Sequence, residues 1–322
     1  MNEHKRILLF GAGKSATVLI DYLKKISIEF SWFVTVADSN LEAAQSKVGD
    51  HDYARAAQVN IENERERQNL IADADIVISM MPPHLHYKIA VDCIALKKHL
   101  LTASYVDEKI KQLEPDIKNN GLLFLCEMGL DPGIDHMSAM QLFDRVRSAG
   151  GTITSFKSHC GGLVAPESDD NPWHYKISWN PRNIILAGKA GAVYKENNKV
   201  VHLPYEQLFN AKKLVEVPGD TLYAYYPNRD SLGYIQLYQL DSASTFVRTT
   251  LRHPDFSFGW KNIIDLKLTD EEKIYETDGL SVSAFFKMHF DRNRFGEWLN
   301  NMLTSRLNYA KDMMEKLKNL MD

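Results

Sequence analysis

The chain has 322 residues, 44% of them hydrophobic and 25% charged, with a formal net charge of −4 at pH 7. This length allows two domains, the acidic balance argues against a general nucleic-acid binder, and no apolar stretch reaches the roughly 20 residues that span a bilayer. The charged first residues enter a strand at once, so no signal peptide is predicted. The three cysteines lack a C-x-x-C pair, which favours a reducing, cytoplasmic location without cysteine-bound zinc.

The first predicted unit is a strand, a glycine-rich turn and a helix. Residues 7–10 form an apolar run typical of a buried strand, and the pattern Gly11-x-Gly13-x-x-Ala16 follows. Gly11 permits a tight turn, Gly13 lets the backbone approach a pyrophosphate, and Ala16 lets the helix pack closely on the strand. The pattern therefore predicts a dinucleotide site at the start of the helix. A glycine turn that merely ends a strand is the alternative.

The second predicted strand, residues 32–38, ends in an acid. Asp38 lies where the dinucleotide-binding pattern places a carboxylate for the ribose hydroxyls. Asp38 could also cap the next helix, residues 41–47, and the two roles can coexist. A carboxylate here would repel a 2′-phosphate, and the neutral Ser39 and Asn40 offer no arginine to bind one. The sequence therefore predicts NAD as the cofactor, with NADP as the second choice.

Strands and helices continue to alternate up to residue 126. The further strands are predicted at residues 59–61, 75–79, 99–102 and 122–126, and the helices between them at 62–71, 87–95 and 108–119. This alternation predicts an α/β fold of the Rossmann type, with a doubly wound parallel sheet. Ligands bind such sheets at the carboxyl ends of the strands. The cofactor-binding residues predicted at that edge are Gly11, Ala12, Gly13, Lys14, Ser15, Ala16, Asp38, Ser39, Asn60, Met80, Met81 and Pro82.

A His-x-His pair follows the fourth predicted strand. His84 and His86 could suggest a metal, but no third ligand lies nearby in the sequence. Loop or capping roles are therefore favoured for both histidines. No metal site is predicted in the chain.

The second half of the chain carries a series of turn-rich motifs. After GLDPGIDH at residues 129–136, which opens a helix at 134–149, come a strand at 152–158, CGGL at 160–163, APE at 165–167, NP at 171–172, SWNPR at 178–182, PNRDS at 227–231 and TLR at 250–252. In this order, and together with the glycine pattern, these motifs resemble the saccharopine dehydrogenases that form L-glutamate, also called saccharopine reductases. The resemblance runs from the N-terminus to about residue 255 and is weaker beyond it.

The resemblance implies an oxidoreductase of lysine metabolism. The secondary amine of saccharopine would be oxidised to an imine by hydride transfer to a nicotinamide cofactor, and hydrolysis would release L-glutamate and L-2-aminoadipate 6-semialdehyde, reversibly. The resemblance also implies a mixed α/β substrate-binding domain inserted into the Rossmann domain, and a homodimer. The predicted division is a dinucleotide-binding domain at 1–130, a substrate-binding and dimerisation domain at 131–290, and a C-terminal helical segment at 291–322.

The same resemblance assigns roles to particular residues. Carried over by motif, Tyr105, Asp131 and Cys160 are the candidate catalytic residues, and sequence does not decide which of them acts as acid or base. Arginine suits a substrate with three carboxylates, and an acid can hold an ammonium or assist proton transfer. An exposed arginine could equally be a surface ion pair, and a cysteine a small buried hydrophobe. The predicted substrate-binding residues are Ser104, Tyr105, Asp131, Arg229, Thr250, Leu251 and Arg252.

Two other functions stay open from the sequence. One is a related secondary-amine dehydrogenase of the carboxynorspermidine type, and the other is a non-catalytic, cofactor-binding scaffold. The physiological direction, lysine synthesis or breakdown, cannot be read from the residues. Family members usually continue well past this length, and the basic amphipathic helix predicted at 306–320 presents an apolar stripe that needs a partner. The sequence is therefore expected to be a fragment.

Overall fold

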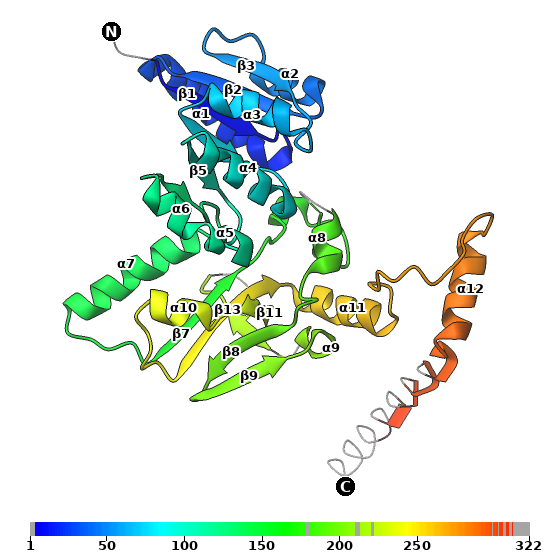
Figure 1. Cartoon of the computed structure of the whole chain (residues 1–322). Helices are drawn as coiled ribbons and strands as arrows, with labels where there is room; N and C mark the ends of the chain where they lie inside the picture. The colour runs from blue at the N-terminus through cyan, green and yellow to red at the C-terminus, as the bar shows by residue number, and fades with distance from the viewer. Residues whose placement is uncertain are drawn as a thin grey trace.

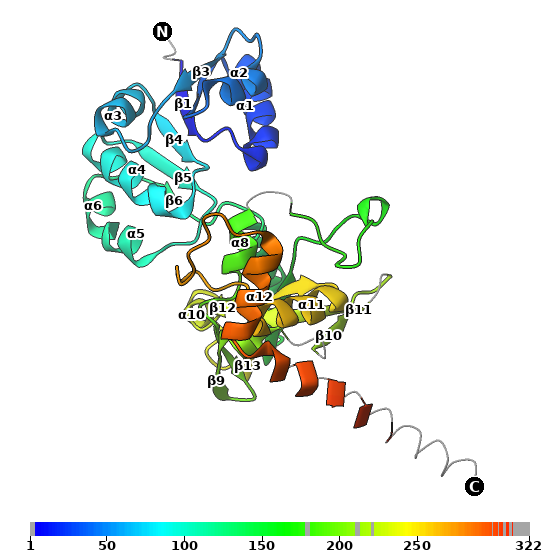
Figure 2. The same ribbon diagram turned by 90° about the vertical axis from the view of Figure 1, so that its right-hand side faces the viewer.

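The computed structural model describes residues 4–177, 181–209, 213–219 and 222–297, and also 299–301, 303, 304, 307, 308 and 311. The chain folds into two α/β domains, an N-terminal one at the top of Figure 1 and a second one below it. Helix α12 (Val282–Arg292) leads the chain away from the second domain, as Figures 1 and 2 show. Among the described residues, none of the helices combines the length and apolar composition that crossing a bilayer needs.

The N-terminal domain is the predicted parallel sheet. Its strands lie in the order β3-β2-β1-β4-β5-β6, and all neighbouring pairs are parallel. The strands are β1 (Arg6–Phe10), β2 (Phe33–Asp38), β3 (Ala54–Gln58), β4 (Ile76–Ser79), β5 (His99–Thr102) and β6 (Phe124–Leu125). The helices are α1 (Thr17–Phe30), which follows a short 3₁₀ turn at Lys14–Ala16, α2 (Leu41–Val48), α3 (Glu64–Ala72), α4 (Pro83–Ala95), α5 (Glu108–Gln112) and α6 (Glu114–Asn119).

Strand β1 is buried on both faces, as its unbroken apolar run predicts. Leu8 and Phe10 pack into the cluster that contains Ile71 and Ile89 of α3 and α4. The alternate residues Ile7 and Leu9 pack on the other face, against α1 and α2. Alternate side chains of the strand thus pack into two separate cores, one on each face of the sheet, as in a doubly wound fold. The predicted fold class is confirmed for this domain.

Three predicted boundaries in this domain are wrong. The third strand is Ala54–Gln58 and not residues 59–61, because backbone pairing to β2 overrides the low strand propensity of its alanines. Helix α4 starts at Pro83 and not at residue 87, since proline is well tolerated in the first turn of a helix. The helix predicted at 108–119 is divided into α5 and α6, with Pro115 in the first turn of α6.

The second domain holds a mixed sheet, as predicted. Its strands are β7 (Ser155–Cys160), β8 (Ala192–Glu196), β9 (Lys199–Leu203), β10 (Leu214–Glu216), β11 (Leu222–Pro227), β12 (Arg229–Asp230) and β13 (Thr245–Arg252). The helices are α7 (Ile134–Ser148), the 3₁₀ turn Pro166–Ser168, α8 (Pro181–Leu186), α9 (Tyr205–Leu208), α10 (Gly233–Leu237) and α11 (Pro254–Asp265). Strand β13 is central, because it pairs in parallel with β7 and antiparallel with β11 and β8.

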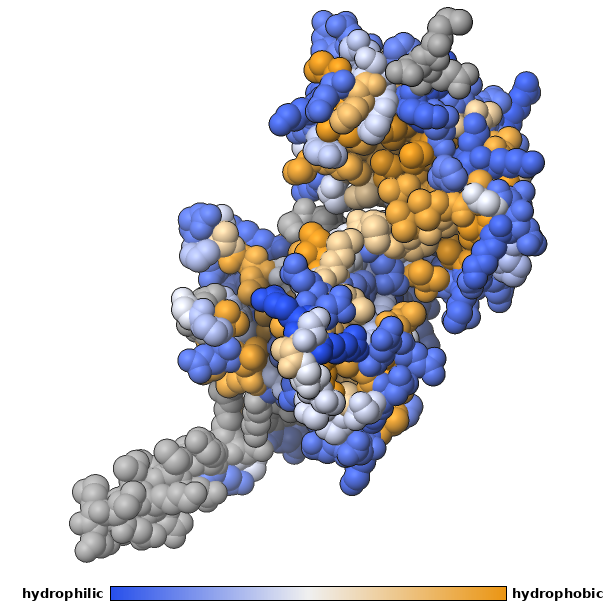
Figure 3. Space-filling view, turned by 90° about the vertical axis from the view of Figure 1, so that its left-hand side faces the viewer, coloured by the Kyte–Doolittle hydropathy of each residue, from blue (hydrophilic) through white to orange (hydrophobic). Residues whose placement is uncertain are grey.

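The two domains join through a tight turn at residues 129–133. Gly133 has φ 150, and a Cβ atom there would lie 2.0 Å from the carbonyl oxygen of Gly129. Only glycine fits this position, so the turn that leads into α7 has a fixed path. In Figure 3, hydrophobic surface gathers on the part of the N-terminal domain that lies next to the second domain. The helix predicted at 306–320 lies almost wholly outside the described residues.

Candidate active site

The glycine turn lies at the carboxyl edge of the parallel sheet. Gly11 has φ 102, and a Cβ atom there would come within 3.1 Å of the carbonyl oxygen of Met80, which follows β4. Residues 13–15 are exposed, and Ala16 is fully buried. Because the first N–H groups of a helical turn have no partner within it, they are available to an anion. The turn therefore fits the pyrophosphate of a dinucleotide.

Asp38 joins the end of β2 to this turn. The N–H of Ala12 donates to Asp38 Oδ2 at 2.7 Å, and the N–H of Asn40 donates to Oδ1 at 2.9 Å. The side chain of Asn40 caps α2 by accepting from the N–H of Ala43, so the capping role considered for Asp38 belongs to Asn40. The carboxylate of Asp38 is thus held beside the backbone that would approach the cofactor.

Other predicted cofactor residues lie along the same edge. Met80, Met81 and Pro82 connect β4 to α4, and Asn60 follows β3 with its Oδ1 accepting from the N–H of Glu62. Lys47, which sequence reasoning missed, donates from α2 to the carbonyl of Gly13 and, at 2.8 Å, to the hydroxyl of Thr17. A lysine one helix away carries no local sequence signal for this contact.

His86 lies buried at the ends of β4 and β5. Its Nδ1 is 2.9 Å from the hydroxyl of Ser79, and its Nε2 is 2.7 Å from the hydroxyl of Ser104. Burial lowers the pKa of His86 to about 4, so the imidazole is neutral near pH 7. The predicted loop or capping role is wrong for His86, because α4 begins earlier and encloses it. His86 instead fixes the hydroxyl of Ser104, a predicted substrate-binding residue.

Asp131 is the centre of the second group of predicted residues. It accepts a hydrogen bond from the hydroxyl of Tyr105 at 3.0 Å and from Nη2 of Arg248 at 2.6 Å. The charge of Asp131 also contributes to raising the pKa of the nearby Cys160 thiol, after burial. The structure thus brings together the three residues predicted as catalytic, from the end of β5, the turn before α7 and the end of β7.

Arg248 is the functional candidate that sequence reasoning missed. Its Nη2 also donates to Asp135 at 2.9 Å, and its guanidinium carbon lies 4.4 Å from the ring centroid of Tyr234. Burial alone would lower the pKa of Arg248, but Tyr105 and Asp131 raise it above its ordinary value. The signal was present in the sequence, because Arg248 is a charged residue in the middle of a strand, and such residues are rarely buried unless paired.

A further polar layer lies behind Tyr234. The hydroxyl of Tyr234 donates to Glu127 at 3.2 Å, and Nε2 of His136 lies 2.9 Å from the same carboxylate. Burial alone would raise the pKa of Glu127. The contacts from His136, the N–H of Val106 and Tyr234 outweigh burial and bring this pKa below its ordinary value, so Glu127 is ionised at neutral pH. This layer holds the aromatic ring on which Arg248 rests.

Arg229 lies on the open side of the same group. It is exposed at the start of β12, and its guanidinium carbon is 5.4 Å from the ring centroid of Tyr105. Within the described part of the chain, no carboxylate forms an ion pair with Arg229, so the alternative of a surface ion pair lacks a partner there. An arginine without an ion-pair partner among the described residues, held over the ring of Tyr105, can bind an anionic group of a ligand.

The TLR segment forms a different group further along β13. Arg252 donates from Nη1 to the carbonyl of Leu251 at 2.8 Å, and its guanidinium carbon lies 5.1 Å from the ring centroid of Tyr175. Leu251 is buried, and Thr250 pairs with Cys160 across the β7–β13 ladder. The interactions of Arg252 are therefore with its own aromatic neighbours and not with the Asp131 group.

All three thiols are protonated at neutral pH. Burial raises the pKa of Cys93 to about 12 and that of Cys126 and Cys160 to about 11. Native protein should react with iodoacetamide at pH 8 about 100-fold more slowly than a small free thiol, because only the thiolate is nucleophilic. Protein unfolded in denaturant, as the control, should label all three cysteines rapidly. Fast labelling of native Cys160 would show that it carries a thiolate.

Both halves of the chain match models of known protein families. The family model described as "Saccharopine dehydrogenase C-terminal domain" matches residues 129–319, and the one described as "Saccharopine dehydrogenase NADP binding domain" matches residues 7–125. The chain belongs to the saccharopine dehydrogenase family. The resemblance drawn from the sequence motifs is thereby confirmed.

Individual relatives agree with this family. The chain is 36% identical over 271 residues to "Saccharopine dehydrogenase [NADP(+), L-glutamate-forming]" of Saccharomyces cerevisiae, covering 83% of this chain and 59% of that protein. It is 35% identical over 292 residues to "Alpha-aminoadipic semialdehyde synthase" of Arabidopsis thaliana, covering 84% of this chain and 27% of that protein. The solved apo saccharopine dehydrogenase (L-Glu forming) of Saccharomyces cerevisiae matches with a TM-score of 0.74 and 35% identity, covering 83% of this chain and 59% of that one.

Proposed function

We propose that this chain forms the catalytic domains of a saccharopine dehydrogenase that releases L-glutamate. The enzyme would oxidise the secondary amine of saccharopine to an imine, and hydrolysis would then give L-glutamate and L-2-aminoadipate 6-semialdehyde. The names of the relatives support this activity, although the chain spans only 59% of the length of the yeast relative. The geometric support is Arg229, which forms no ion pair among the described residues and lies over the ring of Tyr105, whose hydroxyl donates to Asp131. A carboxylate-bearing amine would bind there.

The residues of each domain take separate parts in this reaction. The glycine turn and Asp38 would hold a nicotinamide cofactor, whose chemistry is to take up a hydride from the carbon next to the substrate nitrogen. Arg229 would bind a substrate carboxylate, because a guanidinium fork matches a carboxylate in two-point contact. Asp131, which accepts hydrogen bonds from Tyr105 and Arg248, is the acceptor placed to hold the substrate ammonium or take its proton.

Tyr105 and Cys160 would act as proton donors and not as bases. Burial and the charge of Asp131 raise the pKa of Tyr105 to about 12, and the same two causes raise the pKa of Cys160 to about 11. Both groups are therefore neutral in the working pH range, and the hydroxyl of Tyr105 donates to Asp131. They would keep this carboxylate oriented while the substrate nitrogen changes its charge.

We further propose NAD as the preferred coenzyme. Two observations point in opposite directions: the family model and the fungal relatives carry NADP in their names, whereas Asp38 would repel a 2′-phosphate. We expect wild-type protein mixed with saccharopine to reduce NAD with a higher kcat/KM than NADP, measured by the absorbance of the reduced nicotinamide. Asp38→Ala should lower the ratio of kcat/KM with NAD to kcat/KM with NADP about 10-fold or more, since it removes the charge that repels the 2′-phosphate.

The outcomes of this assay separate the alternatives. Glu42→Ala, which removes an exposed carboxylate from the first turn of α2, is the matched control and should leave the preference unchanged. A wild-type preference for NADP would refute the role of Asp38 but not the reaction. Turnover of another secondary amine in place of saccharopine would favour the carboxynorspermidine type, and coenzyme binding without any turnover would favour a scaffold.

A further inference from the structure

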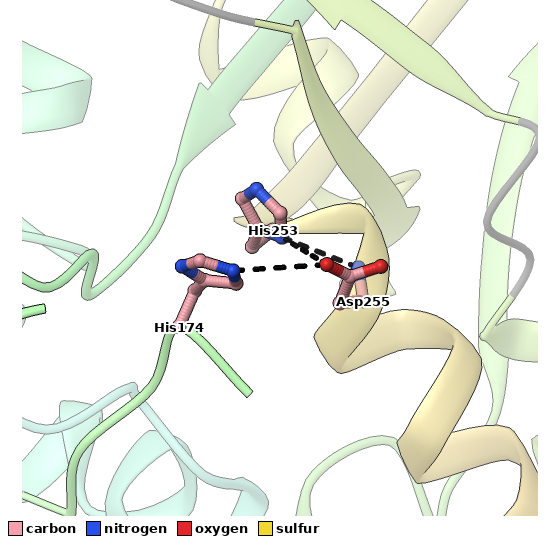
Figure 4. A group of neighbouring side chains, drawn as sticks. All are labelled: His174, His253 and Asp255. Carbon is pink, nitrogen blue, oxygen red and sulfur yellow. Dashed lines mark hydrogen bonds and ion pairs between the residues drawn. The ribbon is translucent and has the colours of Figure 1, made fainter. Parts of the chain in front are cut away.

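A cluster of two histidines and an aspartate lies outside the site described above. His174 belongs to the loop that follows the 3₁₀ turn Pro166–Ser168, whereas His253 and Asp255 lie where β13 ends and α11 begins. Nε2 of His174 is 3.7 Å from Oδ2 of Asp255, and Nδ1 of His253 is 3.5 Å from the same oxygen. Figure 4 shows both imidazoles turning a ring nitrogen toward this carboxylate.

The hydrogen bonds of the cluster leave lone pairs that face one another. Nδ1 of His174 lies 2.6 Å from a carboxylate oxygen of Asp169, so in the neutral imidazole this nitrogen carries the proton and donates. Nε2 of the neutral ring is then an acceptor, yet it faces another acceptor, the Asp255 oxygen. Nδ1 of His253 is a third acceptor, and it receives the N–H of Asp255 in a long 3.3 Å bond. A cation bound by all three acceptors would replace this long bond.

We propose that His174, His253 and Asp255 bind one zinc ion, with Asp169 orienting His174. Zinc takes imidazole nitrogens and carboxylate oxygens at about 2.0–2.2 Å in a tetrahedron, whose edges are then about 3.3–3.6 Å. The nitrogen-to-oxygen distances of 3.5 and 3.7 Å are close to such edges, and the three ligand atoms all lie within 4.8 Å of one another. A carboxylate on the second nitrogen of a zinc-bound histidine is a common feature of zinc sites.

The surroundings hold the cluster in place and leave it open to solvent. Trp173 packs on α11 so closely that a Cβ atom on Gly259 would lie 2.5 Å from its ring. This contact anchors the loop and places His174 over His253, with 3.8 Å between the ring centroids. The side chains of His174, His253 and Asp255 are 35%, 27% and 64% exposed to solvent, so an ion can enter. The fourth position would be left to water.

Zinc at this position would tie the 169–174 loop to the end of β13. His253 directly follows Arg252, so the ion would fix the strand end beside one of the predicted substrate-binding residues. This inference does not depend on the proposed function, and its failure would leave that proposal untouched. The site was not predictable from the sequence, because His174 and Asp255 are 81 residues apart in the chain.

The test is zinc binding to metal-free protein by isothermal titration calorimetry, with zinc chloride as the only ligand. We expect one zinc per chain with a Kd in the micromolar range or tighter. His174→Ala should weaken binding at least about 100-fold, and Asp169→Asn about 10- to 100-fold. His202→Gln removes an exposed histidine from β9 and serves as the matched control, with unchanged binding expected. Cobalt(II) should give the strong visible absorption of a tetrahedral site in wild type and lose it in His174→Ala.

Other outcomes would overturn the proposal. If zinc shows no saturable binding to wild type, the acceptors that converge on Asp255 are satisfied by a proton on His174 and not by a metal. If zinc binds equally well to wild type, His174→Ala and His253→Gln, the ion is held elsewhere. His253→Gln also loses an N-cap of α11, so the His174 variant, which changes only a loop side chain, decides the question.

Discussion

Replacing Arg248 by methionine is expected to lower the free energy of unfolding by about 3–5 kcal/mol. Arg248 is 3% exposed and pairs through one nitrogen with both Asp131 and Asp135. Methionine fills a similar volume but leaves two carboxylates in the interior without their cation, and a charge stranded there is costly. Thermal unfolding should show a fall in Tm on the order of 10 °C.

Two further variants test whether this loss comes from the stranded charges. Arg65→Met removes an exposed arginine from α3 and should change stability by less than about 0.5 kcal/mol. Adding Asp135→Asn to Arg248→Met should recover about 1 kcal/mol or more of the free energy of unfolding, because the effects of substitutions within one ion-pair network are not additive. If Arg248→Met were as stable as wild type, the buried ion pairs could not be holding the turn before α7 in place.

Removing Arg229, unlike removing Arg248, should have little effect on stability and a large effect on substrate binding. Arg229→Ala is expected to raise the KM for saccharopine on the order of 30-fold or more, because a charged contact that loses its partner typically costs about 2–5 kcal/mol. The Tm should stay within about 2 °C of wild type, since Arg229 is exposed and forms no ion pair within the described residues. Steady-state kinetics and thermal unfolding of the same preparation measure both quantities.

The matched control is Arg145→Ala, which removes the same charge from the exposed face of α7. Its KM should match that of wild type, so a purely long-range effect of net charge can be distinguished from a direct contact. Arg229→Lys should give an intermediate KM, because lysine keeps the charge and loses the planar fork. Unchanged kinetics in Arg229→Ala would remove this residue from the substrate site.

Local patterns were enough to predict the N-terminal domain. Apart from β3, the strands of the parallel sheet are short, mostly apolar runs, and the turn after β1 carries the glycines that its backbone requires. The order and type of these elements could therefore be predicted from the sequence. β3 was misplaced because its residues are mostly alanine, and the pairing with β2 that makes them a strand is not visible locally. Helix α4 was predicted to start at residue 87, although it begins at Pro83, because proline is tolerated in the first turn of a helix.

The candidate site was predictable only where a motif carried it. Tyr105, Asp131 and Cys160 come from three separate segments, and the structure pairs Tyr105 with Asp131 and places Cys160 close enough to feel the charge of Asp131. Arg248 lies two residues before the TLR motif and was missed, since its role depends on how β13 is placed across from the turn before α7. The polar layer of Glu127 and His136 was missed for the same reason, because its contacts with Tyr234 join segments about 100 residues apart.

The double pairing of Arg248 also constrains how this protein can diverge. Arg248 cannot be lost alone, because both Asp131 and Asp135 would then lie in the interior without their cation, whereas loss of one acid still leaves a balanced pair. We therefore expect homologues to keep Arg248 wherever they keep Asp131 or Asp135. Arg229, which is exposed and forms no ion pair within the described residues, is under no such constraint.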